Sequence, residues 1–352
     1  MKTLEALYEA QKIAFSPFVF QTAATLIDLN VLETIESNRE NKLTIDELTE
    51  KVNVSKYGLT VLLEMAIAAG MVHSDEEGRL ELTKVGYFVL TDKMTKVNLN
   101  FTQDVCYLGL FNLTDAIKNG TPEGLKMIGN WPTVYEGLSQ LPDKIKKSWF
   151  DFDHYYSDNA FGEALGIIFK NNPKQIFDIG GNTGKWAIAS AKHNPSVQVK
   201  ILDLPGQIKL AQQNINTIAD IKDRVSYLPI NMLDPLSEIP AGADVYWMSQ
   251  FLDCFSEQEI ENILLKIKKN CTEDADIYIM ETFIDDQKFQ AASFSLIATS
   301  LYFTAIANGN SKMYSKSVFN YIINKAGFET VNEYPSIGTG YHTILHCKLK
   351  KK

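Results

Sequence analysis

One short stretch of the chain combines residue types and spacing that could hold a ligand. Residues 176–179 form an apolar run with an acid at Asp178, and Gly180, Gly181 and Gly184 follow before a helical pattern resumes. This order predicts a strand, a tight glycine turn and a helix. Glycine lets the backbone approach a ligand where a Cβ atom would collide, and the first turn of a helix offers unpaired N–H groups. The stretch is therefore a candidate binding loop.

The ligand predicted for this loop is a nucleoside without phosphates. The spacing Gly180-Gly181-x-x-Gly184 differs from the G-x-G-x-x-G dinucleotide pattern, and the loop lacks the Lys-Ser/Thr end of a phosphate-binding loop. A second apolar run, residues 197–202, ends at Asp203, whose carboxylate can accept hydrogen bonds from both hydroxyls of a ribose. A glycine loop with such an acid indicates S-adenosylmethionine as the leading candidate.

The same residues carry a family resemblance that extends over nearly the whole chain. Residues 177–184 and the run Leu202-Asp203-Leu204-Pro205-Gly206 resemble the first two motifs of the class I O-methyltransferases of the plant caffeate and animal hydroxyindole type. The resemblance implies an S-adenosylmethionine-dependent enzyme that methylates a hydroxyl or acidic group of a small aromatic acceptor. In the family, an acid and a methionine hold the adenine. Asn231 and Met232 occupy these positions here, so an amide replaces the usual acid.

The motifs and the resemblance together indicate one set of cofactor-binding residues. They are Asp178, Gly180, Gly181, Gly184, Asp203, Leu204, Asn231, Met232 and Ser249.

Composition narrows the class of protein. The chain has 352 residues, 45% hydrophobic and 22% charged, with a net charge of −9. The negative charge disfavours nucleic acid as a partner, because phosphate binding needs a basic face. Four scattered cysteines without CxxC spacing indicate neither a metal site nor a disulfide framework. No signal peptide and no continuous apolar stretch of membrane-spanning length is evident, so we expect a cytoplasmic protein without a membrane partner.

Residues 1–98 are expected to form a winged-helix domain. Helical patterns precede a hairpin around residues 75–78, and Thr44 with Glu47 forms a capping box. The helix from Lys56 is mostly apolar and the wing is acidic, which disfavours DNA binding. The resemblance instead implies that this domain forms a homodimer.

Residues 99–170 are expected to form a helical connector that contributes to the acceptor pocket. Aromatic residues are frequent in it, and many must fill the core. Because related enzymes bind flat aromatic acceptors here, the resemblance makes His154, Tyr156 and Asp158 candidate acceptor contacts, together with Phe251 beyond the connector. Residues 171–352 alternate strands and helices, which predicts a doubly wound, mostly parallel α/β sheet of Rossmann-like type.

The chain departs from the family at the catalytic base. The family places a histidine after the fourth strand and braces it with two acids. Alignment of that strand puts Asp253 at the histidine, Glu281 at the first acid and Val318 at the second. The base position is therefore a carboxylate, and one bracing acid is missing.

Three interpretations follow. Asp253 is itself the base, with Glu281 raising its pKa by like-charge proximity. Alternatively, His154 or His342 is the base. In the third interpretation, the protein does not methylate a phenol in the family's way: it methylates a more acidic group that needs no base, or it uses the bound cofactor for other chemistry or sensing. A purely structural role for Asp253, as the cap of the helix that starts near Ser256, is also open, although Ser256 with Glu259 fits a cap better.

Overall fold

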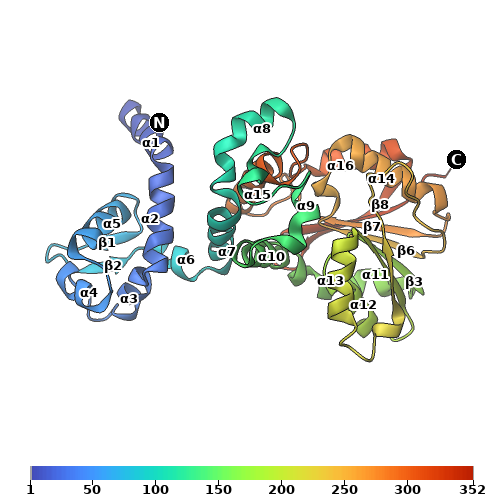
Figure 1. The fold of residues 1–352 in the computed structure, drawn as a ribbon, viewed down its shortest axis with the longest axis horizontal. Coiled ribbons are helices and arrows are strands. Elements are labelled where there is room, and N and C mark those ends of the chain that lie inside the picture. Colours follow the sequence, from blue (N-terminus) through green and yellow to red (C-terminus); the bar gives the residue numbers. More distant parts are fainter. Residues whose placement is uncertain (1, 352) are drawn as a thin grey trace. The chain divides into compact units, whose positions relative to one another are not determined.

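The computed structural model describes residues 2–351 and divides into two compact units, Met1–Gln103 and Asp104–Lys352 (Figure 1). The residues of the connector predicted from sequence lie mostly in the second unit, in the same body as the sheet. Each unit has its own buried core.

The first unit contains seven helices and a two-stranded antiparallel hairpin in the described residues. Its elements are α1 (Thr3–Ala14), α2 (Ser16–Asp28), α3 (Val31–Ser37), α4 (Ile45–Lys51), α5 (Lys56–Ala68), β1 (Val72–Ser74), β2 (Leu80–Leu82), α6 (Lys84–Thr91) and α7 (Lys93–Phe101). The capping box predicted at Thr44 is confirmed, since its hydroxyl accepts from the Glu47 N–H. Ser55 caps α5 in the same way.

Helix α1 has an unusual surface. None of its residues is buried within the chain, and Leu4, Leu7 and Ile13 are all more than half exposed. Helix α2, by contrast, buries residues such as Leu26 against α5 and the hairpin. An apolar helix face of this kind is typical of an interaction surface.

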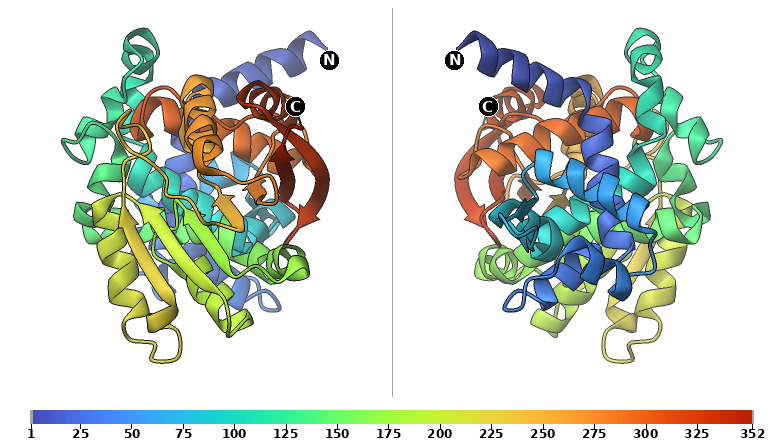
Figure 2. Two further views of the ribbon diagram at one scale, coloured as in Figure 1. Left: turned by 90° about the vertical axis from the view of Figure 1, so that its right-hand side faces the viewer. Right: turned by 90° about the vertical axis from the view of Figure 1, so that its left-hand side faces the viewer.

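The second unit is built on a seven-stranded sheet with the order β5-β4-β3-β6-β7-β9-β8. The first five strands are parallel, and β8 and β9 close one edge as an antiparallel hairpin (red in Figure 2). The strands are β3 (Gln175–Ile179), β4 (Gln198–Asp203), β5 (Val225–Pro229), β6 (Val245–Ser249), β7 (Asp276–Glu281), β8 (Phe328–Ile337) and β9 (His342–Leu349). The predicted doubly wound, mostly parallel sheet is confirmed.

Helices cover both faces of this sheet. One face packs on α11 (Phe161–Ile168), α12 (Lys185–His193) and α13 (Pro205–Ile215), and the other on α14 (Glu257–Asn270) and α16 (Lys316–Ala326) (Figure 1). The strand order turns back between β3 and β6. In sheets of this kind, ligands bind at the carboxyl ends of the strands at such a switch point.

Further helices form a layer beside the sheet. They are α8 (Leu113–Asn119), α9 (Val134–Gly137), α10 (Asp143–Ser157) and α15 (Gln290–Tyr302), joined by short 3₁₀ turns and by π-helical turns at Thr102–Cys106 and Phe303–Ala307. A hydrogen bond of 2.7 Å from Trp149 Nε1 to Tyr302 Oη ties α10 to α15.

One helical segment is apolar on average, although serine and threonine residues interrupt it. Residues Gln290–Ala307 form an 18-residue helix with a mean hydropathy of 1.3, long and apolar enough to cross a membrane, and 44% of it is buried inside the fold. Core helices of soluble proteins meet the same criterion. A second candidate arises only if Ser16–Asp28 and Val31–Ser37, bent by 63°, are taken as one span.

Candidate active site

The glycine loop between β3 and α12 has a backbone that other residues would strain. Gly180 and Gly184 have φ of 75° and 81°, in the left-handed region. A Cβ atom on Gly181 would lie 2.7 Å from Asp178 Oδ2, and one on Gly180 would lie 2.1 Å from the Phe251 ring. Because these positions are glycines, the side chains of Asp178 and Phe251 can pack directly against the backbone of the loop.

Two carboxylates stand at the ends of adjacent parallel strands beside this loop. Asp203 accepts the N–H of Asn182 through Oδ2 and that of Leu204 through Oδ1, both at 2.7 Å. Burial raises the pKa of Asp203 to about 6, although the two hydrogen bonds act in the opposite direction and lower it. Burial, followed by the charge of Asp203, raises the pKa of Asp178 to about 8. These two acids therefore flank the glycine loop in a low-dielectric setting.

The residues around the loop fit the amino-acid and ribose parts of S-adenosylmethionine. Asp178 Oδ2 and Ser249 Oγ are buried without a hydrogen-bond partner in the described residues. Asp203 is fixed by two backbone donors and keeps lone pairs that can accept ribose hydroxyls. Buried polar atoms normally have partners, so these atoms indicate a ligand or water at this place.

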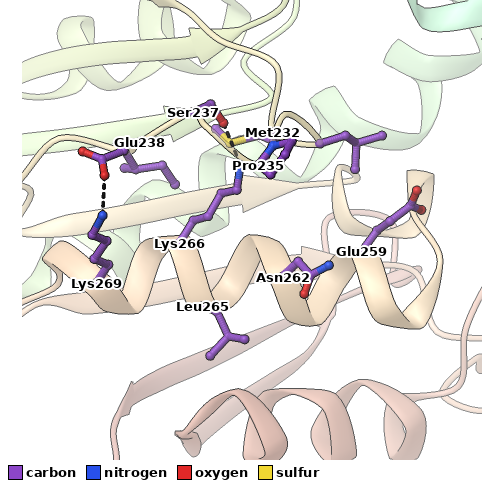
Figure 3. Close-up of a pocket in the computed structure, with 11 residues that line it drawn as sticks. Met232, Pro235, Ser237, Glu238, Glu259, Asn262, Leu265, Lys266 and Lys269 are labelled. Atoms are coloured by element: carbon purple, nitrogen blue, oxygen red, sulfur yellow. Dashed lines mark hydrogen bonds and ion pairs between the residues drawn. The ribbon is translucent and has the colours of Figure 1, made fainter.

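The predicted adenine contacts lie one strand further along the sheet. Met232 is buried, and Asn231 is exposed with its Oδ1 accepting the Leu233 N–H at 2.9 Å. Met232 also borders a hollow of about 490 Å³ between residues 232–239 and α14 (Figure 3). The lysines of that hollow are already engaged, because Lys266 donates to Ser237 Oγ at 2.7 Å and Lys269 pairs with Glu238.

The end of α10 meets the glycine loop. Asp153 Oδ2 accepts from Asn182 Nδ2 at 3.2 Å, and Asp158 Oδ2 accepts from Lys185 Nζ at 2.5 Å. His154 Nδ1 lies 3.6 Å from both acids. The structure thus brings two of the predicted acceptor contacts, His154 and Asp158, to the loop.

The other two predicted contacts differ in their surroundings. Tyr156 is 6% exposed and packs edge-on against Tyr155 and Tyr341, so it builds the wall of the connector. Phe251 is partly exposed and its ring covers Gly180.

The candidate base lies just beyond β6. Asp253 is 5% exposed, in a 3₁₀ turn at Leu252–Cys254, and its Oδ1 is 3.5 Å from the Cys254 thiol, which donates to it. Glu281, at the end of β7, is 1% exposed. Its Oε1 accepts the N–H groups of Phe251 and Leu252 at 3.2 and 3.0 Å, while Oε2 has no partner in the described residues.

Burial and neighbouring charges raise the pKa values of both Asp253 and Glu281. Burial raises the pKa of Asp253 well above its ordinary value, and the charge of Asp153 adds to the rise. Burial and then the charge of Asp253 raise the pKa of Glu281. Two buried acids whose charges act on one another cannot both ionise freely. One of the two is therefore suited to hold a proton near neutral pH.

Neither the capping role for Asp253 nor His342 as the base fits the structure as well as Asp253 as the base. Ser256, not Asp253, caps α14, since Ser256 Oγ accepts the Glu259 N–H and the capping box is complete. His342 is 1% exposed, and burial lowers its pKa to about 4. Thr343 pairs with Glu281 across β9 and β7, so the neighbouring His342 points to the opposite face of the sheet. The geometry therefore favours Asp253 over His342 as the partner of Glu281.

Sequence reasoning missed several residues around Asp253. Asp153, Tyr135 and Tyr302 all act on its surroundings: the charge of Asp153 reaches Asp253, and Tyr135 neighbours Cys254, Tyr302 and Asp253. Burial and these neighbours keep the pKa of Tyr135 well above its ordinary value. The only signal in the sequence was the density of aromatic and acidic residues in the connector.

Comparisons with known proteins agree with this geometry. An O-methyltransferase domain model matches residues 166–329, and a dimerisation2-like domain model matches residues 8–79. The chain is 25% identical over 339 residues to L-tyrosine C(3)-methyltransferase of Streptomyces lavendulae, covering 95% of this chain and 90% of that protein. It is 23% identical to demethylspheroidene O-methyltransferase of Rhodobacter capsulatus, with 82% and 69% covered.

Solved structures show the same fold. Mitomycin 7-O-methyltransferase superposes with a TM-score of 0.72 at 18% identity, covering 99% of this chain and 98% of that one. Human N-acetylserotonin methyltransferase in complex with S-adenosylmethionine gives a TM-score of 0.66 at 15% identity, with 100% and 99% covered. The chain thus matches an O-methyltransferase domain over residues 166–329 and a dimerisation2-like domain over residues 8–79, and the glycine loop and Asp203 lie within the first of these two matches.

Proposed function

We propose that this protein transfers a methyl group from S-adenosylmethionine to a small phenolic acceptor and that Asp253 takes the acceptor proton. The observation that carries the proposal is the buried pair of Asp253 and Glu281 at the carboxyl ends of β6 and β7. The resemblance in sequence aligns this pair with the histidine and the first acid of the family. The pair lies beside the loop segment that contains Ser249 and Phe251.

The residues divide into two groups by role. Asp203 and the backbone of residues 180–184 hold the nucleoside, and Met232 packs on the adenine. S-adenosylmethionine supplies an electrophilic methyl group on a sulfonium and leaves as S-adenosylhomocysteine. Asp253, ionised, accepts the proton of the acceptor hydroxyl while the oxygen forms its bond to the methyl carbon. Glu281 holds the turn that carries Asp253 through its two backbone hydrogen bonds.

A carboxylate with a raised pKa suits this task. A phenol has a pKa of about 10, so an ordinary aspartate is a weak base for it. Burial and neighbouring acids raise the pKa of Asp253. This narrows the difference between the pKa of Asp253 and that of the phenol, so proton transfer becomes less costly. An adjacent Glu281 that keeps its own proton leaves Asp253 free to cycle between its two states.

Methylation of carbon is the second candidate. The relative from Streptomyces lavendulae, which matches almost the full chain, is by name a C(3)-methyltransferase of L-tyrosine. Removal of the phenolic proton also makes the carbon beside the hydroxyl nucleophilic. After that carbon bonds to the methyl group, its ring proton leaves to solvent, the aromatic ring is restored, and the oxygen regains a proton from Asp253. The same base would therefore serve either outcome, and the orientation of the ring above the methyl group would decide between them.

A labelled-methyl transfer assay tests both candidates. The protein is incubated with methyl-labelled S-adenosylmethionine and a panel of phenols, catechols and aromatic acids, and the products are analysed by NMR. We expect label on oxygen of at least one phenol, and label on ring carbon would favour the second candidate. Absence of transfer to every member, in a protein that binds S-adenosylhomocysteine, would refute the proposal and favour a cofactor-binding protein with other chemistry.

We also infer a homodimer. The match to a dimerisation-like domain and the exposed apolar side chains of α1 and α2 support it. Light scattering should give about twice the mass of 39.6 kDa. Replacing Leu7 and Ile13 with Asp should shift the protein to the monomer, and an unchanged dimer would place the interface elsewhere.

A further inference from the structure

We propose that Tyr135 is a second catalytic residue, whose hydroxyl donates a hydrogen bond to the acceptor oxygen from which Asp253 removes the proton. The proposal rests on the proposed function and deepens it, because it assigns the group that stabilises the phenolate during methyl transfer. Tyr135 lies on α9 (Val134–Gly137), in the layer of helices beside the sheet.

The packing of α9 brings Tyr135 to the segment that carries the base. Helix α9 contacts the π-helical turn Phe303–Ala307. The residue after that turn, Asn308, donates from Nδ2 to the carbonyl oxygen of Cys254 at 2.5 Å. The turn is therefore tied to the residue next to Asp253. The side chain of Tyr135 enters the surroundings of Asp253 from the layer of helices, and the two groups act on one another electrostatically.

The hydroxyl of Tyr135 is buried and has no hydrogen-bond partner among the residues that the structure describes. Its polar neighbours include Cys254, Tyr302 and Asp253. The thiol of Cys254 donates to Asp253 Oδ1 at 3.5 Å, and a thiol is a weak partner for a hydroxyl. Tyr302 Oη already accepts from Trp149 Nε1. Because buried polar atoms normally have partners, an atom of a ligand or a water is expected beside the Tyr135 hydroxyl.

The acceptor oxygen fits as that partner. A hydroxyl that gives its proton to Asp253 must lie within hydrogen-bond reach of this carboxylate. It therefore enters the space that Asp253 and Tyr135 both border. Burial and the surrounding groups keep the pKa of the Tyr135 hydroxyl well above its ordinary value, so this hydroxyl keeps its proton near neutral pH and can donate it in a hydrogen bond.

Tyr135 and Asp253 act on different lone pairs of the acceptor oxygen. As the acceptor O–H bond breaks, the proton passes to the Asp253 carboxylate, and the negative charge that develops on oxygen accepts the hydrogen bond from Tyr135. A further lone pair forms the bond to the methyl carbon, the carbon–sulfur bond breaks, and its electrons stay on sulfur. Tyr135 keeps its proton throughout. A fixed donor of this kind lowers the barrier because it stabilises developing charge more than it stabilises the neutral phenol.

Binding of 4-nitrophenol tests the proposal without turnover, because its phenolate absorbs visible light and its phenol form does not. Full-length protein saturated with S-adenosylhomocysteine is titrated with this ligand at a series of pH values. The natural protein is compared with Tyr135→Phe and with the control Tyr227→Phe, which removes a hydroxyl on β5 that is also buried without a partner in the described part of the chain. A second ligand, 4-nitrotoluene, has a methyl group in place of the hydroxyl and measures whether the pocket is intact.

In Tyr135→Phe, the pH at which bound 4-nitrophenol ionises should rise by about one to two units, because one hydrogen bond to a charged group changes this equilibrium by about 10- to 100-fold. Tyr227→Phe should leave that pH unchanged, and 4-nitrotoluene should bind all three proteins alike. The Tm of Tyr135→Phe should not fall, since the hydroxyl loses no protein partner. An unchanged ionisation pH in Tyr135→Phe, equal weakening of both ligands, or no binding of 4-nitrophenol to the natural protein would overturn the proposal.

Single-turnover methyl transfer separates the role of Tyr135 from the proposed reaction. Tyr135→Phe should slow transfer to a weakly acidic phenol by about 10- to 100-fold and transfer to an acidic phenol by less, because a more stable phenolate needs the donor less. An equal loss for both phenols would overturn the proposal, since a residue that only shapes the site would act on both alike. A natural protein that transfers no label, but in which bound 4-nitrophenol responds to Tyr135→Phe as expected, would refute the proposed reaction alone.

Discussion

Replacement of Asp253 by Asn removes the proposed base and keeps the shape of the side chain. General-base catalysis contributes about 10²–10⁴-fold to rate, so kcat on the enzyme's acceptor should fall by that factor, or about 3–5 kcal/mol of barrier. Affinity for S-adenosylhomocysteine should change little, because the residues proposed to hold the nucleoside lie around Asp203 and the glycine loop. Label-transfer kinetics and calorimetry measure these two quantities separately.

The same substitution should stabilise the protein at high pH. The folded-state pKa of Asp253 is raised above its unfolded value, so its contribution to stability is present at low pH and is lost as pH rises through the folded value. Each unit of such a shift corresponds to about 1.4 kcal/mol, and to roughly 3–6 °C in Tm for a unit of a few hundred residues. Asp253→Asn should therefore melt above the natural protein at pH 9 and close to it at pH 4.

Ser256→Ala is the matched control for a structural role. It removes the observed cap of α14, which should lower stability by about 1 kcal/mol at every pH and leave kcat nearly unchanged. If Asp253→Asn gave this same pattern, a lower Tm with kcat intact, the reasoning that assigns Asp253 to proton transfer would be refuted.

Three further predictions concern the cofactor site and the sheet. Gly181→Ala places a Cβ 2.7 Å from Asp178 Oδ2 and should weaken S-adenosylhomocysteine binding at least about tenfold, as measured by calorimetry. Unchanged binding would show that the loop backbone shifts to accommodate the added atom. Because the ribose hydroxyls favour ionised Asp203, whose pKa is about 6, affinity should rise from pH 5 to pH 7 and then level off, and Asp203→Asn should remove the slope. Burial lowers the pKa of His342 to about 4, so the folded state favours the neutral ring. The stability that this contributes is present above the ordinary pKa of histidine and is lost as the pH falls toward 4. In thermal melts His342→Phe should reduce that acid loss, and an unchanged acid limb would assign the loss to other groups.

The cofactor half of the site could be predicted from sequence because its residues are adjacent in the chain or at the ends of recognisable strands. The three glycines adopt their turn locally, and Asp203 is placed by the parallel pairing of β3 with β4. Caps such as those at Thr44 and Ser256 are also local, since donor and acceptor lie three residues apart.

The acceptor half could be predicted only as a region. The contact of Asp153 with Asn182 joins residues 29 positions apart across a helix and a loop, and periodicity does not determine such a contact. Trp149 and Tyr302 meet across 153 positions. Their aromatic character indicated burial, whereas their partners depend on how irregular turns place α10 and α15. The helix Gln290–Ala307 has a high mean hydropathy that the search for continuous apolar stretches did not single out, because serine and threonine residues interrupt it.

The pH dependence of single-turnover methyl transfer to a neutral phenol, at saturating S-adenosylmethionine, tests the role of Asp253 most directly. We expect the rate to rise with pH along a limb set by Asp253 and Glu281, above the range of an ordinary carboxyl group. In Asp253→Asn that limb should disappear and leave a slow rate that follows ionisation of the phenol itself. An identical limb in both proteins would contradict the assignment of Asp253 as the base.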